Sequence, residues 1–180
     1  SVTRGRRGVK RHIVLIGLPG AGKTTIGRLL AERLGAPFLD IDAGIVRKMQ
    51  MPVTRIFGEH GEPFFRRLEA EGMKQALSGP AAVIAPGGGW AAQPGALEGI
   101  TGEALVVYLR TMALTASKRA GGEGTRPLLI GEDPVEKMRQ LLRDREQFYL
   151  QAECEVKTDV KGARALADEI VQLAQERAGW

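Results

Sequence analysis

Residues 17–24 read Gly17-Leu18-Pro19-Gly20-Ala21-Gly22-Lys23-Thr24, which matches the pattern G-x-x-x-x-G-K-[ST] of a phosphate-binding loop. An apolar run of strand length, residues 12–16, precedes the pattern, and apolar residues at helical spacing follow it. The alternative is an ordinary glycine-rich turn before a helix. The complete pattern between a predicted strand and a predicted helix favours the phosphate loop.

The residues of this loop suit the binding of a nucleotide. Glycines let consecutive backbone N–H groups surround polyphosphate oxygens without a side chain in the way. Lys23 can reach the β- and γ-phosphates, Thr24 offers a hydroxyl to Mg²⁺, and the following helix points its positive end at the anion. The residues expected to bind the nucleotide are Gly20, Ala21, Gly22, Lys23, Thr24 and Thr25.

The composition is that of one globular domain: of 180 residues, 43% are hydrophobic and 26% are charged. No apolar run approaches the roughly 18 residues that span a bilayer, so we expect a soluble, cytoplasmic protein with no membrane partner. The single cysteine, Cys154, excludes an internal disulfide. With only two histidines beside it, the sequence shows no Cys/His metal cluster.

The net charge is +5, and five of the basic residues lie among residues 1–11. We expect this segment to be a basic tail, solvated or disordered, followed by a single domain over residues 12–180. Aromatic residues make up 5% and do not alternate with basic ones as in a base-stacking surface. We therefore expect no nucleic-acid partner; such a partner would require salt-dependent binding that disappears when residues 1–11 are removed.

A second strand is expected over residues 37–41, and two acids lie near its end. Alternation along a strand would put Asp40 and Asp42 on one side, at the carboxyl edge where ligands bind in an open parallel sheet. One acid could support Mg²⁺, and the other could accept a proton from a substrate hydroxyl. The alternative is that Asp42 caps the next helix.

Further strands are expected over residues 81–85, 104–109 and 153–157, with helices between them. This alternation predicts an α/β fold, a three-layer α/β/α sandwich with a five-stranded, mostly parallel sheet. The helix that begins near Pro63 carries two successive arginines, residues 66 and 67, about 100° apart, so at most one of them faces a site. From the residues alone, a solvated helix face is favoured for both.

Two glycine-rich segments are candidate ligand contacts. The three glycines at 87–89 follow a predicted strand, where a ligand could approach the backbone closely; a flexible turn is the alternative. Arg126 lies among glycines in a lid expected around residues 119–131, where it could stabilise a transferred phosphoryl group. The alternative there is a plain surface loop.

Taken in order, these residues resemble the shikimate kinase family over about residues 13–149. The phosphate loop alone would indicate only a nucleotide-binding superfamily. The specific part is an ordered set comprising Asp40-Ile41-Asp42, Phe57, Gly61-Glu62, Phe65-Arg66-Arg67-Leu68-Glu69, Gly87-Gly88-Gly89, Arg126-Pro127-Leu128-Leu129, and Arg145 with Tyr149. The resemblance implies P-loop kinase topology, ATP and Mg²⁺ as cofactors, and phosphorylation of the 3-hydroxyl of shikimate in the biosynthesis of chorismate and aromatic amino acids.

The resemblance also implies the site residues. The substrate would be bound by Asp42, Phe57, Phe65, Arg66, Gly87, Gly88, Gly89 and Arg145. Asp42 would be the catalytic base, and the two arginines would bind the shikimate carboxylate. On the nucleotide side, Lys23 and Arg126 would be catalytic on the phosphates, Thr24 and Asp40 would hold Mg²⁺, and Arg119 would lie against adenine.

Two residues depart from the family pattern. Trp90 follows the three glycines where a small residue is usual, and its bulk is expected to change the edge of the pocket. Ala85 stands where a hydroxyl is frequent, which would weaken the ordering of water near Mg²⁺.

Two other functions remain as alternatives. The first is a kinase of the same fold for gluconate or a nucleoside monophosphate, against which the arginine pair and Asp42 argue because they suit a hydroxylated carboxylate. The second is a catalytically silent nucleotide-binding relative, against which the retention of Lys23 and Arg126 argues. From the small size alone, we expect a monomer.

Overall fold

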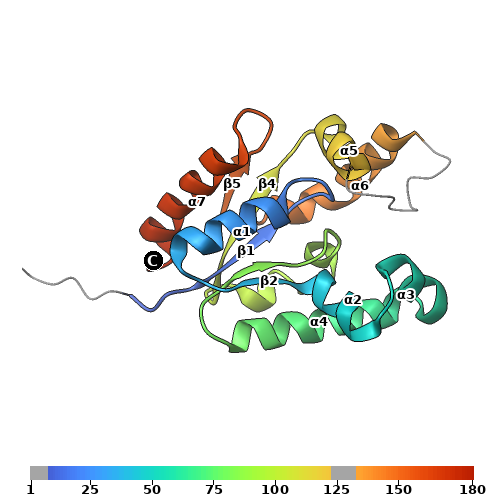
Figure 1. Ribbon diagram of the computed structural model, residues 1–180, viewed down its shortest axis with the longest axis horizontal. Helices are drawn as coiled ribbons and strands as arrows, with labels where there is room; N and C mark the ends of the chain where they lie inside the picture. Colours follow the sequence, from blue (N-terminus) through green and yellow to red (C-terminus); the bar gives the residue numbers. More distant parts are fainter. Residues whose placement is uncertain (1–7, 123–132) are drawn as a thin grey trace, which may run out of the picture.

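The computed structural model describes residues 8–122 and 133–180, which form a single sheet covered by helices (Figure 1). The strands are β1 His12–Ile16, β2 Phe38–Asp40, β3 Val83–Ala85, β4 Ala104–Arg110 and β5 Cys154–Lys157. The helices are α1 Lys23–Leu34, α2 Ile41–Met49, α3 Val53–His60, α4 Glu62–Ser78, α5 Ala113–Gly122, α6 Pro134–Tyr149 and α7 Ala163–Arg177. Short 3₁₀ turns lie at Trp90–Ala92 and Glu98–Ile100.

The sheet has five strands in the order β2-β3-β1-β4-β5, and every pairing is parallel. The predicted fold class is therefore confirmed, and the sheet is fully rather than mostly parallel. Parallel strands direct all their carboxyl ends to one edge of the sheet. β1 lies in the middle, where the strand order changes direction, and ligands bind at such a switch point in open α/β sheets.

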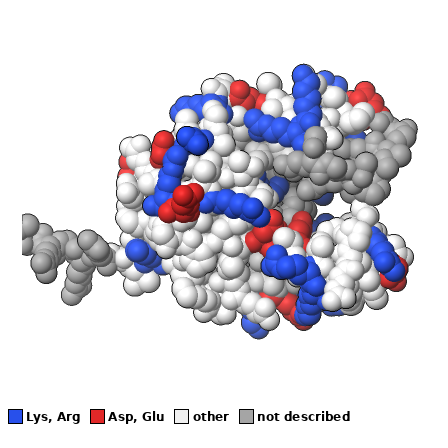
Figure 2. Space-filling view, in the orientation of Figure 1, with Lys and Arg blue, Asp and Glu red and all other residues white. Residues whose placement is uncertain are grey.

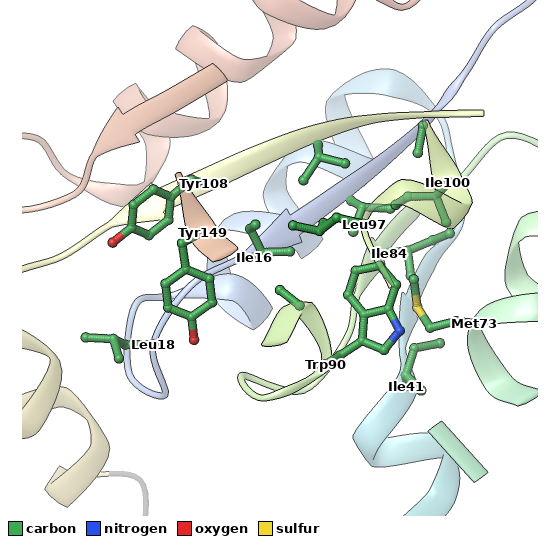
Figure 3. Packing of buried hydrophobic residues seen from close by; sticks show 14 of the residues in the cluster. Ile16, Leu18, Ile41, Met73, Ile84, Trp90, Leu97, Ile100, Tyr108 and Tyr149 are labelled. Carbon is green, nitrogen blue, oxygen red and sulfur yellow. The ribbon is translucent and has the colours of Figure 1, made fainter. Parts of the chain in front are cut away.

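The two faces of the sheet are covered by different helices. Along β1, Ile13 and Leu15 pack against α1 and α7 in one hydrophobic cluster. Val14 and Ile16 point the other way and pack with residues of α4, α5 and α6 in a second cluster, part of which is shown in Figure 3. This alternation follows from the two-residue period of a strand and produces the three predicted layers. The short helices α2 and α3 extend beyond the β2 edge (Figure 1).

The segment around Asp42 differs from the prediction. β2 ends at Asp40, which caps α2, since its Oδ1 accepts a hydrogen bond from Ala43 N at 3.1 Å. Asp42 lies in the first turn of α2, so the predicted alternation of the two acids along one strand was wrong. The alternative also named the wrong residue, because the capping acid is Asp40. A helix that begins directly after a strand leaves no loop residues to mark the boundary.

The first residues of the described chain are tied to its last ones. The N–H of Arg11 donates to Ala178 O at 2.9 Å, and the Arg11 guanidinium pairs with Glu153 at 2.5 Å. Trp180 Nε1 donates to Arg11 O at 2.9 Å. Residues 1–7 of the predicted tail lie outside the described residues. Within the described ranges, none of the helices combines the length and hydrophobicity needed to cross a lipid bilayer.

Candidate active site

The phosphate loop connects β1 to α1 through backbone conformations that favour glycine. The φ angles are +153° at Gly17, +80° at Gly20 and +98° at Gly22. The Lys23 ammonium donates to the carbonyl oxygens of Gly17 at 2.7 Å and Leu18 at 2.9 Å. Lys23 is therefore folded over its own loop, in a position where phosphate oxygens could replace these two carbonyls.

Thr24 and Asp40 form a polar pair beside the loop. The Thr24 hydroxyl donates to Asp40 Oδ2 at 3.3 Å. In the part of the chain that the structure describes, no group of three or more His, Cys, Asp or Glu residues could hold a metal ion. Mg²⁺ does not need such a cage, because it keeps several waters and binds through one or two carboxylates and the substrate phosphates. A hydroxyl and a carboxylate next to a phosphate loop fit that mode of binding.

Asp42 lies where two cavities adjoin. The larger cavity, of about 550 Å³, is also lined by Lys23, Thr24 and Asp40. The smaller cavity has a volume of about 110 Å³. The residues that line both are Asp42, Val53, Phe57, Gly87 and Gly88. Figure 2 shows a hollow in the surface with acidic and basic side chains along its edge. A carboxylate at the junction can therefore face phosphates on one side and a second substrate on the other.

Two guanidinium groups meet in the smaller cavity. Arg66 comes from α4 and Arg145 from α6. A Cβ added to Gly89 would lie 2.5 Å from Arg66 Nη2 and 3.1 Å from Arg145 Nη2, so both groups pack against the bare backbone of this glycine. A carboxylate matches such a pair in charge and planar geometry. The side chain of Arg66 is only 18% exposed, so the solvated face favoured from the residues alone was wrong for Arg66, whereas Arg67 is exposed.

Glu69, named above only within the family pattern at residues 65–69, is part of this site. Its side chain is 1% exposed, and its Oε1 accepts a hydrogen bond from Arg66 Nη1 at 2.8 Å. Its Oε2 is buried without a hydrogen-bond partner among residues 8–122 and 133–180. A Cβ added to Gly87 would lie 2.8 Å from this oxygen and 2.7 Å from Asp42 Oδ1, so the two carboxylates lie close together beneath Gly87.

The environment of Glu69 favours its protonated form. Burial raises the pKa of this carboxyl from 4.5 to about 7; Arg66 and Arg145 oppose the rise, and the charge of Asp42 adds to it. An acidic residue on a helix is usually exposed. The one signal in the sequence is that Glu69 follows Arg66 by three residues, a spacing at which two side chains of a helix can pair.

The raised pKa of Glu69 predicts how the free energy of unfolding depends on pH. Between the unfolded pKa of 4.5 and the folded pKa of about 7, the folded state binds the proton more tightly. The stabilisation is thus present at low pH and lost as pH rises through 7, by roughly 2–3 kcal/mol between pH 5 and pH 8. Urea denaturation at several pH values should show this loss relative to Glu69→Gln, which lacks the titrating group. A constant difference between the two proteins would contradict the prediction.

The remaining predicted pocket residues surround the smaller cavity. The rings of Phe57 and Phe65 meet edge to face, with centroids 5.0 Å apart. The Tyr149 hydroxyl donates to Gly88 O at 2.6 Å, which fixes the glycine loop to α6; burial raises the pKa of this tyrosine. Pro19, Met138 and Leu141 complete the lining. They were not identified as site residues from the sequence, although Met138, Leu141 and Arg145 are spaced to share one face of a helix.

A third cavity, of about 480 Å³, lies on the other side of the phosphate loop. It is lined by several of the predicted nucleotide-binding residues, namely Gly20, Gly22, Lys23, Thr24, Thr25 and Arg119. Arg119 Nη1 and Nη2 donate to Thr158 Oγ1 at 3.2 Å and Thr158 O at 3.3 Å. The Thr158 hydroxyl is buried against that of Thr111, 2.6 Å away. This threonine pair, not anticipated from the sequence, thus holds Arg119 beside the cavity. Ala21 is buried, and its N–H donates to Leu18 O at 3.0 Å.

Three other expectations have different outcomes. Arg126 and most of the predicted lid lie outside the described residues. Trp90 is only 5% exposed and packs in the core with Met73, Ile84 and Ile41 (Figure 3), so the expected change to the pocket edge was wrong. Ala85 lines the larger cavity, and its effect on water near Mg²⁺ stays a prediction.

The fold and the site define a class of protein. A phosphate loop at the switch point of a parallel 2-3-1-4-5 sheet faces a small cavity with two arginines and a carboxylate, as in a P-loop kinase for a small molecule. The family model described as shikimate kinase matches residues 19–175. The chain belongs to the shikimate kinase family.

Individual relatives agree with this assignment. A shikimate kinase of Mycobacterium avium (strain 104) is 47% identical over 77% of this chain and 78% of its own length. That of Moorella thermoacetica is 44% identical over 88% of this chain and 91% of its own. The solved shikimate kinase of Acinetobacter baumannii in complex with shikimate superposes with a TM-score of 0.86 at 38% identity, covering 94% of this chain and 95% of that one. The family resemblance is therefore confirmed. The alternatives, a kinase for gluconate or for a nucleoside monophosphate, are not supported by these relatives.

Proposed function

We propose that this chain transfers the γ-phosphate of ATP to the 3-hydroxyl of shikimate, giving shikimate 3-phosphate and ADP. The observation that carries the proposal is that Arg66 and Arg145 both pack against Gly89 in the smaller cavity. Asp42 lies where this cavity adjoins the larger one beside the phosphate loop. Shikimate is a small ring with one carboxylate and several hydroxyls, so it matches both ends of this cavity. The shikimate bound to the Acinetobacter baumannii relative supports the same substrate.

The proposed chemistry is an in-line phosphoryl transfer. The 3-oxygen of shikimate bonds to the γ-phosphorus as the bond from that phosphorus to the β,γ-bridging oxygen breaks, and ADP leaves. Asp42 accepts the hydroxyl proton. Arg66 and Arg145 hold the carboxylate, while the Phe57 and Phe65 rings exclude water from one side of the substrate.

The phosphates are bound from the opposite side of the junction. The Lys23 ammonium would give up its hydrogen bonds to the two loop carbonyls and donate to β- and γ-phosphate oxygens instead. We include Arg126 as a second cation toward the transferred group on the basis of the family pattern. Thr24 and Asp40 would hold the Mg²⁺ that accompanies the nucleotide, and the charge of that ion would offset the charge of the phosphates. Arg119 would lie beside the base.

Steady-state release of ADP from MgATP tests the proposed reaction. The acceptors to compare are shikimate, gluconate, a panel of nucleoside monophosphates, and buffer alone. We expect saturable release with shikimate only. Release with another acceptor but not with shikimate would refute the substrate, and ATP binding without release for any acceptor would support a silent relative.

Replacing Arg145 with alanine should raise KM for shikimate by about one to two decades, because a hydrogen bond to a charged group contributes about 1.5–3 kcal/mol. KM for ATP should change little. Arg143→Ala is the matched control, since Arg143 lies on the same helix but is exposed and pairs with Glu136. Equal increases in the two KM values would instead assign Arg145 to the nucleotide.

We also propose that the enzyme acts as a monomer in the cytoplasm, with no nucleic-acid or membrane partner. The support for the monomer is the small size of the chain, 180 residues, and the support for the compartment is that ATP is available there. Light scattering coupled to size-exclusion chromatography measures the mass directly. A mass of twice the chain at micromolar concentration would contradict the monomer.

A further inference from the structure

Four charged side chains from three elements face one another beneath the smaller cavity. Arg66 and Glu69 come from α4, Asp42 from α2 and Arg145 from α6. These are the charged groups that act on Glu69, and the loop at Gly87 brings no side chain between the two carboxylates. With all four groups ionised, two positive charges balance two negative ones.

A bound carboxylate disturbs this balance. It adds a third negative charge beside two guanidiniums, in a small cavity from which it also displaces water. Uncompensated charge is costly in such a site, and a buried acid responds by binding a proton. In addition, Arg66 already donates to Glu69 Oε1 at 2.8 Å, so substrate and Glu69 compete for the same guanidinium.

We propose that Glu69 takes up a proton from solvent when the substrate carboxylate binds between Arg66 and Arg145, so that substrate binding is coupled to protonation of this buried carboxyl. This inference rests on the proposed function, because it uses the same carboxylate-binding pair. The proton goes to Oε2, the oxygen that has no hydrogen-bond partner within the described residues. There it restores the charge balance and gives Oε2 a hydrogen to direct toward the Asp42 carboxylate.

Glu69 rather than Asp42 is the proton acceptor in this coupling because of burial. Glu69 is fully buried, whereas Asp42 is partly exposed and lines the larger cavity as well. Loss of water raises the pKa of Glu69 to about 7 even before substrate binds. Near neutral pH, the free protein is therefore a mixture of both forms, and added negative charge shifts it to the protonated one.

The direction of the pH effect follows. The complex holds more protons than the free protein, so shikimate should bind more tightly as pH falls toward 7 and more weakly as pH rises above it. At pH 7, about half of the free molecules are ionised at Glu69, so the expected uptake is about half a proton per shikimate bound.

Isothermal titration calorimetry of shikimate into the full chain, without nucleotide, measures this uptake. The binding enthalpy at pH 7 is compared in buffers with different ionisation enthalpies, such as phosphate and Tris, and the slope gives the number of protons. We expect uptake in the unaltered protein, none in Glu69→Gln, and the unaltered value in Glu71→Gln, an exposed acid on the same helix. Glutamine keeps the Oε1 acceptor for Arg66. Uptake should be smaller in Asp42→Asn, because the charge of Asp42 contributes to the raised pKa of Glu69.

Two outcomes would overturn the inference while leaving the proposed function standing. They are binding of shikimate without proton uptake, and uptake that survives in Glu69→Gln. No binding of shikimate to the unaltered protein would overturn both proposals together.

Infrared difference spectroscopy keeps the test open if Glu69→Gln does not fold. Shikimate binding to the unaltered protein should produce the carbonyl band of a protonated carboxyl, and the band should shift to lower frequency when the glutamate carboxyls of the protein carry ¹³C. Absence of the band, or a band that does not shift, would contradict the inference.

Discussion

Replacing Asp42 with asparagine is expected to lower kcat by about 10²–10⁴-fold, the usual contribution of a general base. Asparagine keeps the shape of the side chain in the first turn of α2 but cannot take the proton of the attacking hydroxyl. The affinity for ATP should be nearly unchanged, because the phosphate loop is intact. Steady-state ADP release gives kcat, and calorimetric titration with nucleotide gives the affinity.

The control for this variant is Asp144→Asn. Asp144 is exposed on α6 and accepts a hydrogen bond from Gln140, four residues earlier on the same helix. This control should turn over at the normal rate. Normal turnover in Asp42→Asn as well would remove Asp42 from the mechanism and leave it a role in binding the ring hydroxyls at most.

Replacing Lys23 with alanine is expected to lower kcat by about 10²–10³-fold, as for the loss of one preorganised donor to developing charge. The ammonium lies within 2.9 Å of the loop carbonyls and is positioned to act on the β- and γ-phosphates. The fold should survive, because water can reach the released carbonyls in this open cavity. ADP release at saturating ATP separates the effect on turnover from weaker binding.

Lys74→Ala, which removes an exposed lysine of α4, is the matched control. If Lys23→Ala raised KM for ATP but left kcat intact, the lysine would contribute equally to the ground state and the transition state. That result would restrict Lys23 to nucleotide binding.

The parts of the fold that local chemistry determines could be predicted from the sequence. The phosphate loop was bounded by an apolar run and by glycines, and the structure has β1 and α1 on either side of it. One of the helices expected between the last two strands is α6, Pro134–Tyr149, where a proline suits the first turn of a helix and the apolar spacing is regular. The boundary between β2 and α2 could not be predicted, because Asp40 ends the strand and caps the helix at once.

The residues of the site likewise fall into those that could be predicted from the sequence and those that could not. Residues that belong to ordered motifs, such as Lys23, Arg66 and Arg145, could be predicted as site residues from the sequence. These three lie around the cavities in the structure. Glu69 could not be assigned to the pocket, because its burial depends on how α4 packs against α2 and α6. Trp90 was misjudged for a related reason: its side chain turns into the core beneath the sheet instead of toward the cavity, which only the tertiary packing determines.

The position of Trp90, directly after Gly89, makes the glycine loop optically accessible. The chain has two tryptophans, and Trp180 lies at the far end of the sheet, hydrogen-bonded to Arg11. A Trp180→Phe variant would leave one fluorophore, adjacent in the chain to Gly89, against which the Arg66 and Arg145 guanidiniums pack. Its emission would report on any displacement of that loop when a carboxylate binds, with no coupled reaction and no labelled ligand.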